Sequence, residues 1–148
     1  MRQADAAGGR RDVFTVVLRI GLAIAFAIDL YVGVLSLFAP QLIAPLLDIP
    51  VHDPAIVRLA GGEYVVAALV YALAFRAPRR FRVLLWLCAL DQAFAVVMPA
   101  LAVAHGEIPS TWKTVAPIPF QALLALLFAA YAAGARPGRN RSATPFMQ

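Results

Sequence analysis

Charged residues are scarce in this chain. Of its 148 residues only 14% are charged and 62% are hydrophobic, and the mean hydropathy is +0.78. Soluble domains carry about 25% charged residues. A soluble domain of this length has too little interior to hide so much apolar surface. The shortage of charge therefore excludes an ordinary soluble domain.

Cysteine and the common chemical motifs are also missing or rare. Cys88 is the one cysteine, which excludes a disulfide within the chain. The sequence contains no metal-ligand spacing, nucleophile elbow, phosphate-binding loop or dinucleotide fingerprint. No metal site is predicted, and the sequence points to no particular cofactor or catalytic residue.

What the sequence does contain is a series of long apolar runs. The first, from Val13 to Phe38, would be about 39 Å long as a helix, against a hydrocarbon core of about 30 Å. We predict an all-α polytopic membrane protein whose four transmembrane helices form one bundle. The expected spans are residues 13–38, 55–75, 81–104 and 119–135. We expect residues 1–12 to form a cytoplasmic tail and residues 136–148 to form a disordered cytoplasmic tail.

The basic residues indicate the orientation of these spans. A net charge of +5 is compatible with nucleic acid, but the basic residues lie beside the ends of the apolar runs, so no nucleic acid partner is predicted. With four spans, the following arginines fall on one side: Arg2, Arg10, Arg11, Arg76, Arg79, Arg80, Arg82, Arg136, Arg139 and Arg141. Such an excess marks the cytoplasmic side. We therefore expect a protein of the bacterial inner membrane with both termini in the cytoplasm.

Acidic residues lie inside three of the apolar runs. A charge at bilayer depth costs roughly 2.5–3.5 kcal/mol on insertion scales, so Asp29, Glu63 and Asp91 require an explanation. The helical rise places Asp29 about 15 Å and Glu63 about 12 Å below the outer ends of their spans, and Asp91 near mid-membrane. We predict a polar intramembrane cavity, or proton-active site, from the following residues: Asp29, Arg58, Glu63, Asp91, Gln92 and Gln121.

Each of these residues also has a purely structural interpretation. The acids can be hydrogen-bonded to a neighbouring helix instead of binding a proton, a cation or a cationic ligand. Arg58, close to a span end, can extend to the headgroups or pair with Asp53. The sequence leaves these alternatives open.

Small residues indicate how the helices pack. Gly21, Ala25, Asp29 and Gly33 recur every four residues, which predicts a close-packing stripe that turns Asp29 toward the bundle. Leu22 is expected to point outward. The pair Gly61-Gly62 is predicted to permit a second close helix contact.

The order of these features resembles the DoxX-like small four-span bacterial membrane proteins. Phe38-Ala39-Pro40 ends the first span, and Arg58-Leu59-Ala60-Gly61-Gly62 opens the second. A short basic turn and two further spans follow. The resemblance implies a four-helix bundle, linked in some relatives to quinone or thiosulfate oxidation. Only the cluster of Arg58 with Gly61-Gly62 carries over, and no catalytic residue can be assigned through it.

These observations lead to three functional hypotheses. The first is a binding or accessory membrane subunit that accommodates a small amphipathic, lipid-soluble molecule or a membrane protein partner within the lipid bilayer. The second is an intramembrane isomerase or cyclase, with Glu63 or Asp91 as general acid and Asp29 as base. The third is a small proton-coupled transporter, although the arginine bias argues against a dual-topology exporter. Whether the chain is an enzyme and whether it forms a homo-oligomer stay open.

The orientation can be tested with reporter fusions. Fusions at residue 5 and after residue 141 should both report the cytoplasm, because arginines flank all the proposed inner ends. A fusion after residue 108 serves as the control and should report the opposite compartment. A periplasmic signal from either terminal fusion would contradict the four-span arrangement.

Overall fold

Four long helices make up most of the structure. The computed structural model describes residues 2–134, with side chains described from residue 13 onward. The long helices are α1 (Arg2–Phe38), α3 (Pro54–Arg76), α4 (Arg82–Ala104) and α6 (Pro117–Gly134). Short helical segments lie in the connections: η1 (Pro40–Leu42), α2 (Ile43–Leu47) and α5 (Trp112–Val115). The described residues contain no strand, so the predicted all-α class is confirmed.

The long helices have the composition of membrane spans. Val13–Phe38, Pro54–Arg76, Arg82–Ala104 and Trp112–Gly134 are each long and apolar enough to cross a bilayer. Large apolar side chains such as Val83 and Leu126 are exposed on their surface, as expected for helices that face lipid. The chain is therefore a membrane protein with a bundle of four candidate spanning helices.

The helix boundaries differ in detail from the expected spans. Helix α1 begins at Arg2, so it includes most of the residues expected to form the N-terminal tail. The connection before the last span contains α5, and α6 begins at Pro117, two residues before the expected start. The tail predicted at 136–148 lies outside the described residues.

Local signals explain where the helices begin. The Asp53 side chain accepts a hydrogen bond of 2.7 Å from the Ala55 amide, and Pro54 occupies the first turn, where its missing N–H has no consequence. At α5, Thr111 and Thr114 form a reciprocal capping box. Between Pro40 and Pro54 the frequent prolines restrict the chain to η1 and the single short helix α2.

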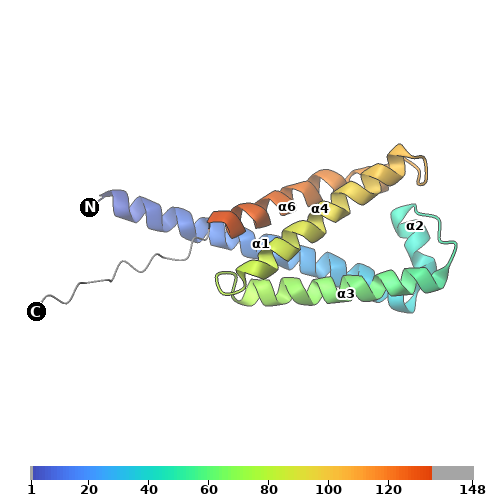
Figure 1. The fold of residues 1–148 in the computed structure, drawn as a ribbon, viewed down its shortest axis with the longest axis horizontal. Helices are drawn as coiled ribbons and strands as arrows, with labels where there is room; N and C mark the ends of the chain where they lie inside the picture. Colours follow the sequence, from blue (N-terminus) through green and yellow to red (C-terminus); the bar gives the residue numbers. More distant parts are fainter. Residues whose placement is uncertain (1, 135–148) are drawn as a thin grey trace, which may run out of the picture.

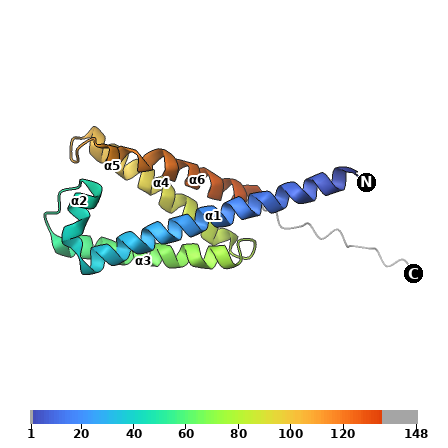
Figure 2. The ribbon, with the colours of Figure 1, turned by 180° about the vertical axis from the view of Figure 1, so that it is seen from behind.

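The long helices associate as two pairs. Helix α1 packs along α3, and α4 packs along α6, whereas α3 and α4 make a smaller contact. Figures 1 and 2 show the two pairs meeting where residues 77–81 join α3 to α4, and separating toward α2 and α5. We call these two ends of the bundle the connection end and the open end.

The hydrophobic core lies toward the connection end. It combines Leu18 and Leu22 of α1 and Tyr71 of α3 with Leu85 of α4 and Phe128 of α6, all of them almost completely buried. At the same end the Arg82 guanidinium donates to the carbonyl oxygens of Ala132 and Ala133, the latter at 3.3 Å. These carbonyls belong to the last turn of α6, where no intrahelical partner is available. Arg82 therefore fastens the start of α4 to the end of α6.

Helices α1 and α3 approach each other most closely at two glycines. A Cβ at Gly61 would lie 2.7 Å from the Ser36 Cβ and 2.9 Å from the Gly33 carbonyl oxygen. A Cβ at Gly33 would lie 2.9 Å from the Val65 Cγ2 and 3.0 Å from the Gly61 carbonyl oxygen. Real Cβ atoms do not come this close, so both positions require glycine for the observed helix separation.

Two packing expectations need correction. Gly62 has no atom within 4 Å of its would-be Cβ, because it lies one residue around the helix from Gly61 and turns away from α1. Leu22 is fully buried and does not point outward. The reason is that α1 has two contact faces: Gly33 lies against α3, whereas Gly21 lies against α6, where its would-be Cβ is 3.0 Å from Leu127 Cδ2.

The neighbouring glycines of α3 provide a matched stability test. Gly61→Ala should destabilise the bundle by about 1–3 kcal/mol, because the new methyl group overlaps the backbone of α1. Gly62→Ala gains the same helix propensity and meets no neighbour, so its stability should be unchanged or higher. Thermal unfolding of both variants in the same detergent measures the difference. Equal melting temperatures would contradict the close approach of α1 and α3.

Candidate functional site

An open groove lies between α3 and α4, where the two helix pairs separate. Its volume is about 570 Å³. The apolar part of its lining includes Leu59, Val66 and Val70 of α3 and Leu87 of α4. Along α3 the lining residues recur every three to four positions from Leu59 to Tyr71, which places them on one face of the helix.

Polar groups interrupt this apolar lining. Glu63 and Tyr71 from α3 and Asp91 from α4 all contribute to the wall. The Tyr71 hydroxyl donates a hydrogen bond of 2.6 Å to Asp91 Oδ2 and accepts one of 2.8 Å from Gln92 Nε2. The Gln92 amide therefore lies directly against the Tyr71–Asp91 pair. These bonds join α3 to α4 and orient the Asp91 carboxyl.

Gln92 is left with an unsatisfied atom in this network. Its side chain is almost fully buried, at 4% exposed, and its Oε1 has no hydrogen-bond partner among the described residues. A buried acceptor without a partner costs about 1–3 kcal/mol. Such groups are uncommon in native structures, so Gln92 is an energetically costly member of this network.

Asp29 approaches the same region from α1. Its side chain is 7% exposed, and it lies on the buried face of the helix with Ala25 and Gly33. The Asp29 and Asp91 carboxyls are near enough to repel each other electrostatically. The Asp29 carboxyl makes no hydrogen bond or ion pair with any group of residues 13–134.

The acids of the groove also lack a cationic partner. Within the described residues, the ion pairs are Lys113 with Asp48 and the wider His105–Glu107 pair at 3.9 Å, and both lie at the open end. The Arg19 guanidinium lies over the Phe75 ring, 5.8 Å from its centroid. Asp29, Glu63 and Asp91 therefore form a group of carboxyls that has no ion-pair partner among the described residues.

The structure brings together four of the predicted site residues and leaves two apart. Asp29, Glu63, Asp91 and Gln92 gather at or behind the groove wall. Arg58 is exposed and neither lines the groove nor pairs with Asp53; its Nε donates to the Leu37 carbonyl oxygen at 3.3 Å. Its partner lies in the last turn of α1, so Arg58 caps that helix. Gln121 of α6 is not part of the groove lining.

Two groove residues were missed by the sequence reasoning. Tyr71 organises the polar network, and Gly62 lines the groove although it was expected to pack against a helix. Their spacing was a usable signal, because Gly62, Glu63, Val66, Val70 and Tyr71 share one helical face. Tyr71 carries no charge, so the sequence alone does not distinguish it from an aromatic residue of the core.

We compared the chain with protein families, curated proteins and solved structures. No protein-family model, curated protein or solved structure matches the chain. The chemistry of the site therefore has to be argued from its own residues. The arrangement offers an apolar surface for a hydrocarbon portion, and carboxyl and amide oxygens for a polar group.

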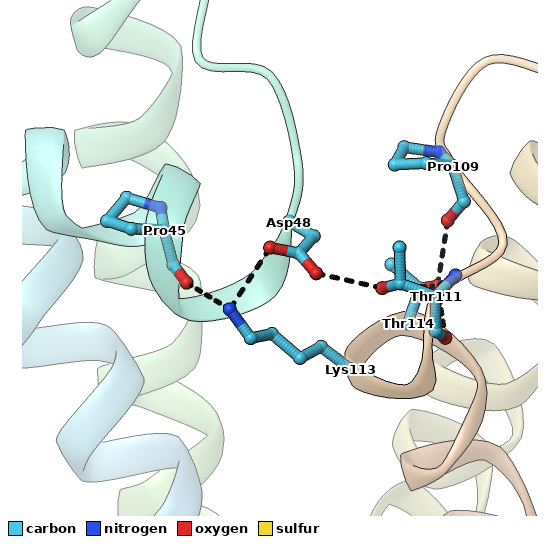
Figure 3. A network of polar contacts seen from close by, with 6 residues as sticks. All are labelled: Pro45, Asp48, Pro109, Thr111, Lys113 and Thr114. Atoms are coloured by element: carbon cyan, nitrogen blue, oxygen red, sulfur yellow. Dashed lines mark hydrogen bonds and ion pairs between the residues drawn. The ribbon is translucent and has the colours of Figure 1, made fainter.

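A polar clamp joins the end of α2 to α5 and the residues just before it, as shown in Figure 3. Lys113 Nζ, at the start of the α5–α6 segment, donates to Asp48 Oδ1 at 3.1 Å and to the Pro45 carbonyl oxygen at 2.7 Å. Thr111 Oγ1 donates to Asp48 Oδ2 at 2.9 Å. Asp48 ends α2 in a left-handed conformation, with φ of 54°. The clamp thus ties the α1–α3 pair to the α4–α6 pair where they are furthest apart.

The clamp should make stability depend on pH. The hydrogen bonds from Lys113 and then Thr111 lower the pKa of Asp48 below its ordinary value. Because the folded pKa is the lower one, the stabilisation is present above the unfolded value of about 3.9 and is lost as pH falls through the folded value. Asp48→Asn should therefore lose less thermal stability than the unmodified chain between pH 6 and pH 3.

The measurement is the melting temperature across this pH range in one detergent. Glu107→Gln is the control, because Glu107 is exposed and has only the wider contact with His105. It should follow the unmodified chain at every pH. An unchanged pH dependence in Asp48→Asn would show that the clamp does not hold the two pairs together.

Proposed function

We propose that this protein binds a small amphipathic molecule from the bilayer in the groove between α3 and α4. The observation that carries the proposal is the groove itself: about 570 Å³ in volume, within the candidate spanning helices, with carboxyls on an otherwise apolar wall. Ligand sites are typically concave, mostly apolar and equipped with a few polar groups that fix orientation.

The distribution of groups along the groove suits such a molecule. Leu59, Val66 and Leu87 offer contacts for an apolar portion, while Glu63 and Asp91 offer acceptors for a polar head. Glu63 is exposed in the groove, whereas the Asp91 carboxyl is held in place by Tyr71. A ligand entering from the lipid would thus meet one exposed carboxyl, Glu63, and one that is held in place by a hydrogen bond, Asp91.

The wider setting is part of the same proposal. The arginine bias favours a bacterial inner-membrane protein with both termini in the cytoplasm, so that the open end faces outward. The resemblance to DoxX-like proteins is consistent with a small membrane subunit that serves a larger partner. The proposed binding in the groove applies equally to an accessory subunit and to a binding protein that acts alone.

Photolabelling with two single-chain amphiphiles tests the proposal. Each probe carries a diazirine on a hexadecyl chain, one with a hydroxyl head and one with a primary ammonium head, in nanodiscs of phosphatidylcholine. We expect at least one probe to label groove residues such as Val66 or Leu87 saturably. Gly62→Leu should reduce this saturable labelling at least tenfold, because its side chain enters open space inside the groove.

Gly134→Leu is the matched control. It introduces the same side chain at the end of α6, also with no atom within 4 Å of the would-be Cβ, and it lies outside the groove. Its labelling should equal that of the unmodified chain. Absence of saturable labelling by either probe, or equal labelling in Gly62→Leu, would overturn the proposed binding function.

A further inference from the structure

The groove region has more hydrogen-bond acceptors than donors. Glu63 and Asp91 line it with carboxyl oxygens, and the buried Gln92 Oε1 next to this pair also lacks a donor among the described residues. The Tyr71 hydroxyl has a single proton, and that proton is directed to Asp91. One amide proton of Gln92 is engaged by the Tyr71 oxygen. The site is therefore built to receive donors.

Its charge is equally one-sided. Two arginines of the spanning helices make contacts elsewhere. Arg58 donates to the Leu37 carbonyl oxygen, and the Arg19 guanidinium lies over the Phe75 ring. Glu63 from α3 and Asp91 from α4 line the same groove, and the Tyr71 hydroxyl holds the Asp91 carboxyl there. A charge in this apolar setting is screened far less than in water.

We propose that the molecule bound in the groove carries a protonated amine, whose N–H groups meet Glu63 and Asp91 while its apolar portion lies along α3 and α4. The inference rests on the proposed binding function and specifies its ligand class. An ammonium group supplies both features that the site lacks, positive charge and several hydrogen-bond donors.

Two other ligand classes fit less well. A quinone presents carbonyl oxygens, which are acceptors and would meet a wall of acceptors. A bare metal ion requires several ligands in close geometry, and residues 13–134 hold no group of three histidine, cysteine, aspartate or glutamate side chains placed for one. The apolar walls beside the carboxyls also favour a ligand with a hydrocarbon portion.

The photoreactive ammonium and hydroxyl probes separate these possibilities. At pH 7 a primary amine is protonated, since its ordinary pKa is near that of lysine, about 10.4. We expect saturable labelling of the groove by the ammonium probe at a concentration at least tenfold lower than by the hydroxyl probe, measured per probe within the disc. Decylubiquinone should compete less well than dodecylamine against the ammonium probe.

Carboxyl variants assign the preference to the groove. Glu63→Gln and Asp91→Asn should each raise the half-saturating concentration of the ammonium probe at least threefold. The hydroxyl probe should be affected by a clearly smaller factor, because the amide still offers an acceptor oxygen to a hydroxyl but no charge to an ammonium group. Glu63 is exposed, so its variant is expected to fold even if loss of the Tyr71 bond impairs Asp91→Asn. Glu107→Gln removes an acid at the open end and should change neither probe.

The outcomes distinguish this inference from the function on which it rests. Equal labelling by both probes, with loss of both in Gly62→Leu, would overturn the amine and retain groove binding. A preference for the ammonium probe that survives Glu63→Gln and Asp91→Asn would also overturn it. No saturable labelling by either probe would overturn both proposals.

Discussion

The close approach of α1 and α3 at Gly33 and Gly61 is the constraint on which the rest of the structure depends. Because neither residue has a Cβ, the two backbones come together until each carbonyl oxygen nearly touches the opposite glycine. Since one face of α3 is held against α1, its opposite face is left to contact α4 or to line a groove. For α3 that other side is the face from Leu59 to Tyr71, which meets α4 only toward the connection end and lines the groove beyond it.

The two ends of the bundle are fastened by different means. At the connection end the buried core and Arg82 hold α4 against α6, and Tyr71 reaches across to α4. At the open end the apolar contact between the pairs is replaced by the polar clamp of Asp48 and Lys113. A partly exposed ion pair is weaker than a packed core and depends on salt and pH. The groove is therefore bounded by one rigid end and one end that responds to conditions.

The sequence predicted the elements of this fold better than their arrangement. Long apolar runs set the four spans, because length and hydropathy are local properties. The four-residue spacing on α1 placed Asp29 on the face that is buried. Whether Gly61 or Gly62 contacts α1 depends on how α3 is rotated about its own axis. This rotation is set by packing against α1, which the sequence of α3 does not show. The depth of Gln121 in its span predicts a place beside the acids. Helix α6 packs along α4, however, and Gln121 lies outside the groove lining.

Burial divides the acids into two kinds. The Asp29 carboxyl is enclosed, has no hydrogen-bond partner in the described part of the chain and does not line the groove. Glu63 and Asp91 form the second kind, because both line the groove, and Asp91 is in addition held by the Tyr71 hydroxyl. Placing three acids without a cationic partner at membrane depth costs free energy. A neutral hydrogen-bonded side chain would join the helices at a lower cost, so a purely structural role explains the acids poorly. A positively charged group in the groove would offset this cost, and for this reason the acids, more than the apolar walls, support an amine as the proposed ligand.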